Sequence, residues 1–216
     1  RALLQKVTIR NNTGDHAAYL KLADSLRTQG LYTDAISEYA RLTPIVMKSP
    51  GSPHKEILRI WPVYCYVKLY EQYSKAATRD KRYLDYANRY FNTALQTVKK
   101  LDQTPPPRQS GEYSLYKLVR ALIRVQYARR FEAQGSPVQA AEYYRQSVLE
   151  VTEGIISARV GLSWLPESLM MAGNAYEKLE LFDPARNVYK QVSIFFKSTK
   201  WETLSNSRLA ALPPPG

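Results

Sequence analysis

The residue types that build most metal and redox sites are nearly absent from this chain of 216 residues. It has one cysteine, Cys65, and two histidines, His16 and His54. A single cysteine excludes an internal disulfide framework and any multi-cysteine metal site. Two histidines leave most metal clusters and catalytic triads without their parts. We therefore expect no metal, no cofactor and no catalytic residue, so the protein is predicted not to be an enzyme.

Long hydrophobic runs are absent as well. The most apolar stretch, ILRIWPVYCYVKLY, is interrupted by Arg59, Pro62 and Lys68, and it is shorter than the roughly 18 to 20 residues that span a bilayer. We therefore expect no transmembrane segment. The chain begins with Arg1 instead of methionine, which we interpret as an excerpt of a longer protein or a processed product.

Acidic residues are scarce relative to basic ones. The chain has 31 Lys or Arg against 19 Asp or Glu, a net charge of +12, and a field of that sign attracts anionic partners. Two basic groups stand out: Lys75, Arg79, Lys81 and Arg82 at a predicted turn, and Lys117, Arg120 and Arg124 on one predicted helix stripe. Each group is either a solvated surface or a contact for phosphates or an acidic peptide, and the pattern alone does not separate these readings.

The chain is rich in helical periodicity. Apolar residues recur at spacings of three and four, and Gly, Pro and capping residues divide the sequence into about nine helical segments. Asp15 is predicted to cap a first helix that ends at Gly30, and Thr33 to cap the second. The dipeptide Ser52-Pro53 is predicted to open a third helix, with a kink or a later start at Pro62.

The stretch DQTPPPRQSG separates two groups of helices. Three consecutive prolines enforce an extended backbone, so residues 102–110 are predicted to form a stiff connector. After it, Ser136-Pro137 and Asp183-Pro184 each combine a capping residue with proline at the first helical position. Thr199 and Glu202 match a capping box, which predicts the start of a final helix.

A short pattern recurs four times along the chain. An alanine is followed four residues later by an aromatic ring, in the pairs Ala35 and Tyr39, Ala87 and Phe91, Ala140 and Tyr144, and Ala185 and Tyr189. Twelve residues before three of these alanines stands a second small residue: Ala23, Ala128 and Gly173. A small residue lets two helices cross closely, and the ring fills the adjacent gap. The pattern therefore predicts helix hairpins in which these small residues contact the second helix.

The pattern resembles that of the tetratricopeptide repeat family, W-x2-L-G-x2-Y followed by A-x3-F. The fourth copy matches it in order through Leu169, Ala172, Gly173, Tyr176, Ala185 and Tyr189. The second copy departs from it, because Tyr70 stands where a small residue belongs. The alanines are 52, 53 and 45 residues apart, whereas the family repeat is about 34 residues long.

The resemblance implies a single all-α domain over residues 1–216, built as a right-handed α-solenoid. Its expected parts are repeats at about 15–48, 53–101, 111–158 and 163–198, the connector at 102–110 and a capping helix at 200–211. A generic helical bundle with coincidental alanines is the alternative. Hairpins of this kind bury their apolar faces only by stacking on one another.

The same resemblance implies a non-enzymatic scaffold that binds a partner protein or peptide. The positive net charge of the chain favours an acidic partner. Ligands of this family lie in a concave groove lined by the first helix of each repeat. The family's clamp for chaperone C-termini needs Lys and then Asn four residues later, where this chain has Leu20 and Asp24, so chaperone tails are not expected. The residues of this chain that the resemblance places in the groove, and so predicts to bind a partner, are Asp24, Arg27, Glu71, Lys75, Arg129, Glu132, Met170, Asn174 and Glu177.

Tyrosine is abundant, with 17 residues. Tyr90, Tyr113 and Tyr143 stand beside repeat positions and are predicted to be exposed anchors for a partner. The alternative function is a basic module that contacts nucleic acid or a membrane surface through the two basic groups. Basic residues with interleaved tyrosines suit single-stranded nucleic acid.

The segment FFKSTKW, at the end of the last repeat, is similar to repeat ends of bacterial envelope proteins, such as outer-membrane assembly lipoproteins and the Tol-Pal-associated periplasmic coordinator. This similarity favours an exported protein.

Overall fold

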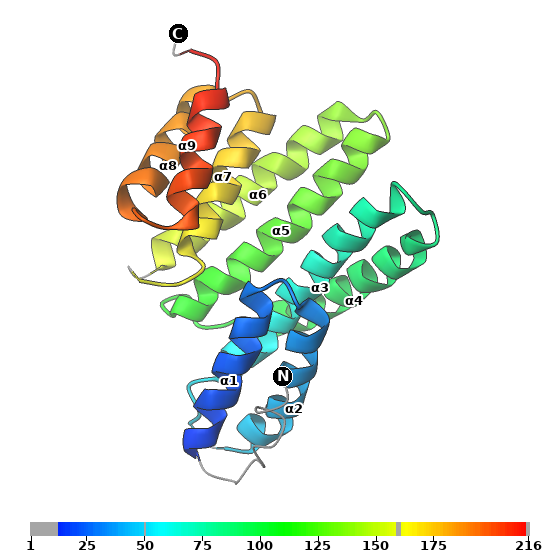
Figure 1. Cartoon of the computed structure of the whole chain (residues 1–216), viewed down its shortest axis with the longest axis vertical. Coiled ribbons are helices and arrows are strands. Elements are labelled where there is room, and N and C mark those ends of the chain that lie inside the picture. Colours follow the sequence, from blue (N-terminus) through cyan, green and yellow to red (C-terminus); the bar gives the residue numbers. More distant parts are fainter. Residues whose placement is uncertain (1–12, 50, 159–160, 215–216) are drawn as a thin grey trace. The chain divides into compact units, whose positions relative to one another are not determined.

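The computed structural model describes residues 13–49, 51–158 and 161–214, with side chains from His16 onward. Within these ranges the protein is all-α, with nine helices and no strands (Figure 1). The all-α class predicted from periodicity is therefore confirmed. Contacts between residues divide the chain into two compact units, Arg1–Leu101 and Asp102–Gly216. The boundary between them falls at the start of the predicted connector, and each unit is described by itself.

The first unit is built on helices α1 (Thr13–Thr28), α2 (Tyr32–Lys48), α3 (Lys55–Ala77) and α4 (Tyr83–Gln103). Helix α2 packs against both α1 and α3, and aromatic rings join α3 to α4. The largest fully buried side chains of this unit are Tyr39, Trp61 and Phe91. Tyr39 and Phe91 are the rings of the repeated alanine pattern, so the pattern correctly marks core positions.

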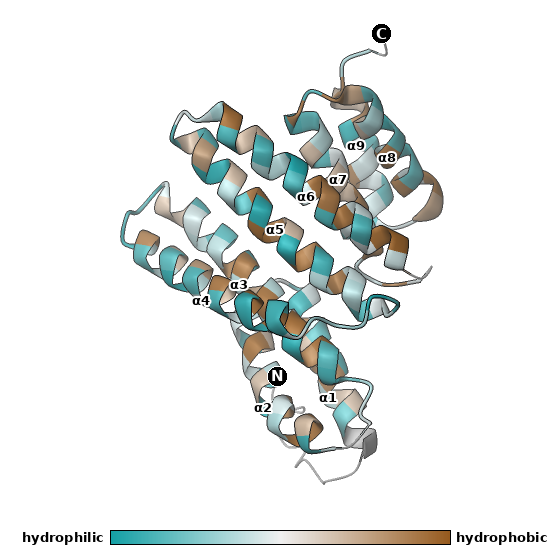
Figure 2. Cartoon of the chain, turned by 180° about the vertical axis from the view of Figure 1, so that it is seen from behind, coloured by the Kyte–Doolittle hydropathy of each residue, from teal (hydrophilic) through white to brown (hydrophobic). Residues whose placement is uncertain are grey.

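The second unit contains α5 (Gly111–Ala133), α6 (Pro137–Ser157), α7 (Leu165–Lys178), α8 (Phe182–Phe195) and α9 (Lys200–Ala211). Each of these helices packs against the next, and α7 also contacts α5 and α9. Hydrophobic residues recur along α5, α6 and α7 with hydrophilic residues between them (Figure 2). Burial of these apolar stripes holds the unit together, because short helices are marginal in isolation.

Several predicted helix starts are wrong by two or three residues. Asp15 lies inside α1, and Thr33 lies in the first turn of α2, whose capping residue Leu31 makes no side-chain hydrogen bond. Helix α3 begins at Lys55 and continues through Pro62, and Asp183 lies inside α8. Thr199 does cap α9, because its hydroxyl accepts a hydrogen bond from the Trp201 amide at 3.2 Å.

A shared backbone turn replaces the missing side-chain caps. In three hairpins the first helix ends in a left-handed residue, Gly30, Gly135 and Glu180, with φ of 78°, 71° and 59°. The next amide donates to the carbonyl five residues back at 2.9 Å, in the pairs Leu31 and Leu26, Ser136 and Phe131, and Leu181 and Tyr176. This is the Schellman arrangement, which closes one helix and directs the chain into the next. The turn therefore sets where α2, α6 and α8 begin.

The predicted close crossing of helices is confirmed at Gly173. A Cβ atom on this residue would lie 2.3 Å from Cε1 of the Tyr189 ring. Tyr189 is fully buried. The absent side chain of Gly173 thus makes room for the ring, as the spacing of small residue and aromatic predicts.

Candidate functional site

Polar residues predicted to line a groove are held by tyrosines of their own hairpins. The Tyr39 hydroxyl donates to Asp24 Oδ1 at 2.6 Å. The Tyr189 hydroxyl contacts Asn174 Oδ1 at 2.8 Å and Glu177 Oε1 at 2.6 Å. Tyr39 and Tyr189 each lie 15 residues after their partner on the first helix. Asp24, Asn174 and Glu177 are therefore structural links between the two helices of a hairpin.

Alkaline pH is expected to destabilise these hairpins. Burial is the main cause that raises the pKa of Tyr39, Tyr144 and Tyr189 above the ordinary 10.0, and the neighbouring acidic side chains raise it further. The unfolded chain releases these protons more readily, so their contribution to stability is full below pH 10 and falls above it. Each pH unit above 10 is expected to cost up to about 1.4 kcal/mol per tyrosine. Urea unfolding at about pH 8 and about pH 11 measures this loss. Replacing Tyr189 with Phe should reduce the loss, and an unchanged pH dependence would contradict the assignment.

The remaining predicted groove positions have different surroundings. The Arg27 guanidinium lies 3.5 Å from the centroid of the Trp61 ring, and Glu71 pairs with Lys68 at 3.3 Å. Glu132 accepts a hydrogen bond from Lys178 of α7 at 3.0 Å. Lys75 and Arg129 are exposed. Met170 is buried in the core cluster of the second unit, so its prediction as a partner-binding residue is wrong.

Two members of the second predicted basic group, Lys117 and Arg120, pair with acidic side chains inside the protein. Lys117 is buried and pairs with Glu150 and Glu153, each at 2.7 Å. Arg120 pairs with Glu150 at 2.7 Å and with Asp102 at 2.6 Å. Arg124 is half-buried, with its guanidinium 6.0 Å from the Tyr143 ring centroid. Lys117 and Arg120 therefore link α5 to Glu150 of α6 and do not form a free surface for phosphates.

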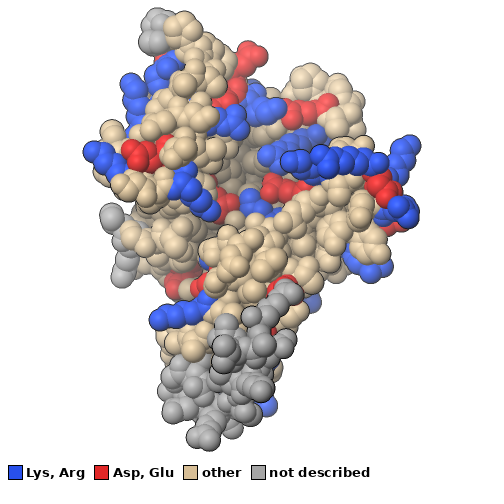
Figure 3. All heavy atoms as spheres, viewed as in Figure 1, with Lys and Arg blue, Asp and Glu red and all other residues tan. Residues whose placement is uncertain are grey.

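The first predicted basic group is exposed. Lys75, Arg79 and Lys81 are exposed around the turn from α3 to α4, whereas Arg82 forms a close pair with Asp80 at 2.7 Å. The face drawn in Figure 3 shows Lys and Arg side chains lying beside Asp and Glu side chains at several places. Pairing removes basic and acidic charges in equal numbers and leaves the net charge of +12 unchanged, and the α3–α4 turn keeps several basic side chains exposed.

Five tyrosines form a cluster beside this turn: Tyr66, Tyr73, Tyr83, Tyr86 and Tyr90. The Tyr73 ring stacks with Tyr86 and Tyr90, with centroids 5.5 Å and 5.4 Å apart. Its centroid is 5.9 Å from that of Tyr83. Burial and the other tyrosines raise the pKa of Tyr73. The edges of the cluster are open, since Tyr83 is 39% and Tyr86 50% exposed.

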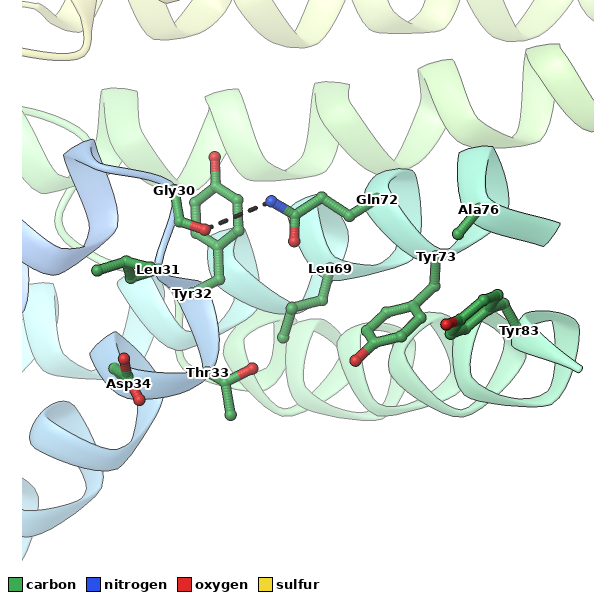
Figure 4. A pocket seen from close by; sticks show the side chains of 10 residues that line it. All are labelled: Gly30, Leu31, Tyr32, Thr33, Asp34, Leu69, Gln72, Tyr73, Ala76 and Tyr83. Carbon is green, nitrogen blue, oxygen red and sulfur yellow. Dashed lines mark hydrogen bonds between the residues drawn. The ribbon is translucent and has the colours of Figure 1, made fainter. Parts of the chain in front are cut away.

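A pocket of about 490 Å³ adjoins the tyrosine cluster. Its lining comes from the α1–α2 turn with the start of α2, from α3 and from the first residue of α4: Gly30, Leu31, Tyr32, Thr33, Asp34, Leu69, Gln72, Tyr73, Ala76 and Tyr83. Gln72 reaches across to the Gly30 carbonyl at 3.4 Å. Figure 4 shows the Tyr73 ring between Leu69 and the Tyr83 ring, with Thr33 and Asp34 towards the other end of the pocket. The pocket thus joins an apolar floor to a polar edge.

The expectations for exposed tyrosines are only partly met. Tyr113 is buried, and its hydroxyl donates to Glu153, so its predicted exposure is wrong. Tyr90 and Tyr143 are half-buried in ring stacks. Tyr73, Tyr83 and Tyr86 were not predicted from the sequence as candidate binding residues. The signal was available for two of them, because Tyr83, Tyr86 and Tyr90 recur at one helical stripe beside the buried stripe of α4.

Other kinds of site find little support. No group of His, Cys, Asp and Glu that could hold a metal ion is found in the described part of the chain. Cys65 is buried, and its burial raises the pKa of the thiol to about 12, so it is not poised as a nucleophile. Every helix within the described ranges is too short or too polar to cross a bilayer.

Comparison with known proteins identifies no family for this chain. No protein-family model matches the sequence, and no curated protein matches it.

Proposed function

We propose that the chain is a non-enzymatic scaffold, built from divergent tetratricopeptide-like hairpins, that binds an acidic segment of a partner protein. The pocket between α2, α3 and α4 supports this proposal most directly. It is bordered by the exposed Tyr83 ring and the half-buried Tyr73 ring, and it is followed by the exposed side chains of Lys75 on α3 and Arg79 in the α3–α4 turn. Concave pockets with an apolar floor and a few polar groups are where ligands bind.

Three features support the repeat architecture. The Schellman turn recurs in three hairpins at equivalent positions. The hydrogen bond from the second-helix tyrosine to the first helix recurs at a separation of 15 residues. In the second unit, α7 contacts both α5 and α9, the pattern that arises when successive hairpins stack with their first helices adjacent. A right-handed α-solenoid is the arrangement that we propose for these hairpins.

The binding mechanism follows from the pocket and its border. One apolar or aromatic side chain of the partner would rest on Leu69 and against the rings of Tyr73 and Tyr83, which contact each other. Full burial of such a side chain is worth about 1.5 to 3 kcal/mol. Acidic residues beside it would meet Lys75, Arg79 and Lys81, which speeds association more than it strengthens the final complex. Affinity thus comes from the anchor, and partner choice from the charge.

A peptide library tests this proposal. Random peptides displayed on phage are selected on the whole chain at physiological salt. Enriched peptides are expected to carry one aromatic or large aliphatic residue flanked by Asp or Glu. The same selection on a Tyr83→Ala variant should lose these sequences, whereas a Leu204→Ala variant, which changes an exposed side chain of the second unit, should keep them. Equal enrichment on both variants would contradict the pocket as the binding site.

Single-stranded nucleic acid is a second candidate ligand, favoured by one observation. Tyr83 and Tyr86 are open to solvent and lie beside Lys81 and other exposed basic residues, the combination on which bases stack and phosphates pair. Salt separates the two functions, because phosphate binding falls steeply as salt rises. If an oligonucleotide binds at physiological salt more tightly than any selected peptide, nucleic acid is the ligand.

A further inference from the structure

The last turn of α8 exposes two adjacent large apolar side chains. Ile194 is 61% and Phe195 73% exposed. Both lie on the outer side of a helix whose other face is core, since Ala185, Tyr189 and Val192 are fully buried. The next residue, Phe196, packs against the core cluster. The turn therefore directs one phenylalanine inward and presents its neighbour to solvent.

The surroundings of this pair are basic. From residue 184 to residue 201 the chain has four basic residues, Arg186, Lys190, Lys197 and Lys200, and no acidic residue. Lys190, Lys197 and Lys200 are exposed. The nearest acid in sequence, Glu202, is engaged with the backbone, because its carboxylate accepts a hydrogen bond from the Ser198 amide at 2.6 Å. The exposed apolar pair thus lies within a local excess of positive charge.

Hydrogen bonds fix the shape of the turn from α8 to α9. The Thr199 hydroxyl donates to the Phe196 carbonyl at 2.6 Å and accepts from the Trp201 amide at 3.2 Å. Ser198 takes the left-handed conformation, with φ of 59°. The Lys200 ammonium lies 4.9 Å from the Trp201 ring centroid. These contacts hold the turn that directly follows Ile194 and Phe195.

We propose that this tip, defined as Ile194, Phe195, Lys190, Lys197 and Lys200, binds an anionic lipid surface. Two exposed apolar side chains beside three exposed lysines match the chemistry of an anionic membrane surface. Aliphatic and aromatic side chains enter the boundary between headgroups and acyl chains, while lysines around them meet anionic headgroups. The site differs in position and in ligand from the peptide pocket of the first unit.

Vesicle co-sedimentation of the whole chain tests the apolar half of this site. The probes are vesicles of phosphatidylcholine alone and vesicles in which about a third of the lipid is phosphatidylglycerol. Binding is expected to the anionic vesicles. The double variant Ile194→Ala/Phe195→Ala should lower the partition coefficient at least about tenfold. The matched control Leu149→Ala/Ile156→Ala changes two side chains of α6 that are 68% and 81% exposed, and it should leave binding unchanged.

Charge variants test the basic half. Replacing Lys190, Lys197 and Lys200 with Gln should weaken binding about fivefold per lysine. Removing three basic residues from the first unit, by Lys75→Gln, Arg79→Gln and Lys81→Gln, should have a much smaller effect. Equal loss from both triple variants would show that the net charge alone drives binding and would overturn the proposal. Equal binding to neutral vesicles would overturn it as well.

A label at the tip reports insertion directly. The buried Cys65 thiol, with its pKa raised to about 12, resists labelling. A Gln191→Cys variant, which changes an exposed residue one helical turn before Phe195, therefore takes an environment-sensitive dye beside the tip and keeps both apolar side chains. The emission should shift to shorter wavelength with anionic vesicles. No shift in a sample that co-sediments would mean that another surface binds the lipid. Because peptide binding uses the first unit, either proposal can fail while the other holds.

Discussion

Replacing Gly173 with alanine is expected to lower the stability of the second unit by at least about 2 kcal/mol. The new Cβ would lie 2.3 Å from Cε1 and 2.7 Å from Cζ of Tyr189. The ring cannot simply move, because it is fully buried and its hydroxyl is held by Asn174 and Glu177. Urea unfolding followed by circular dichroism measures the loss as a lower midpoint.

A second glycine provides the control for this experiment. The three atoms nearest to a Cβ on Gly111, in the first turn of α5, would all belong to the end of the flexible Leu162 side chain, the closest at 3.2 Å. Gly111→Ala is therefore expected to change the free energy of unfolding by less than about 1 kcal/mol, since improved helix propensity offsets the contact. If Gly173→Ala were as stable as Gly111→Ala, the close crossing of α7 and α8 would be wrong.

Removal of the Glu150 carboxylate is expected to cost about 2 to 4 kcal/mol. Its two oxygens pair with Lys117 Nζ and Arg120 Nε, each at 2.7 Å. The side chains of Glu150 and Lys117 are both only 11% exposed. Without the carboxylate, two cations would face each other with Glu153 and Asp102 as their remaining acidic partners. Thermal or urea unfolding of Glu150→Ala measures the loss.

Removal of the Lys117 ammonium is expected to destabilise the protein much less than removal of the Glu150 carboxylate. Lys117→Met keeps most of the buried stem, and Glu150 retains Arg120 while the 44% exposed Glu153 is free to be hydrated. We expect a loss of less than about 1 kcal/mol. A larger loss from Lys117→Met than from Glu150→Ala would contradict the view that Glu150 is the centre of this network.

The sequence was most informative where contacts are local. Helical periodicity predicts the helices, and the spacing of small residue and ring predicts the crossing at Gly173 and Tyr189. Capping residues were less reliable, because Leu31 and Leu181 open α2 and α8 without any side-chain cap. There the preceding Schellman turn sets the start of the helix, and it involves backbone groups that any residue supplies.

Long-range pairing explains the errors in the candidate sites. The stripe of Lys117 and Arg120 suggested a free basic face, but Glu150 lies 33 residues from Lys117 and Asp102 lies 18 from Arg120. A local window of sequence does not contain these partners. The pocket is also a product of folding, since residues near Gly30, Leu69 and Tyr83 come together from separate helices.

The most direct test of the proposed function is a calorimetric titration of the best selected peptide into the whole chain and into its Tyr83→Ala variant. Tyr83 borders the pocket and is 39% exposed, so its removal should leave the fold intact. The dissociation constant is expected to rise at least about tenfold, as loss of an aromatic contact of about 1.4 kcal/mol or more requires. An unchanged constant in the folded variant would place the partner elsewhere and contradict the pocket between α2, α3 and α4 as the binding site.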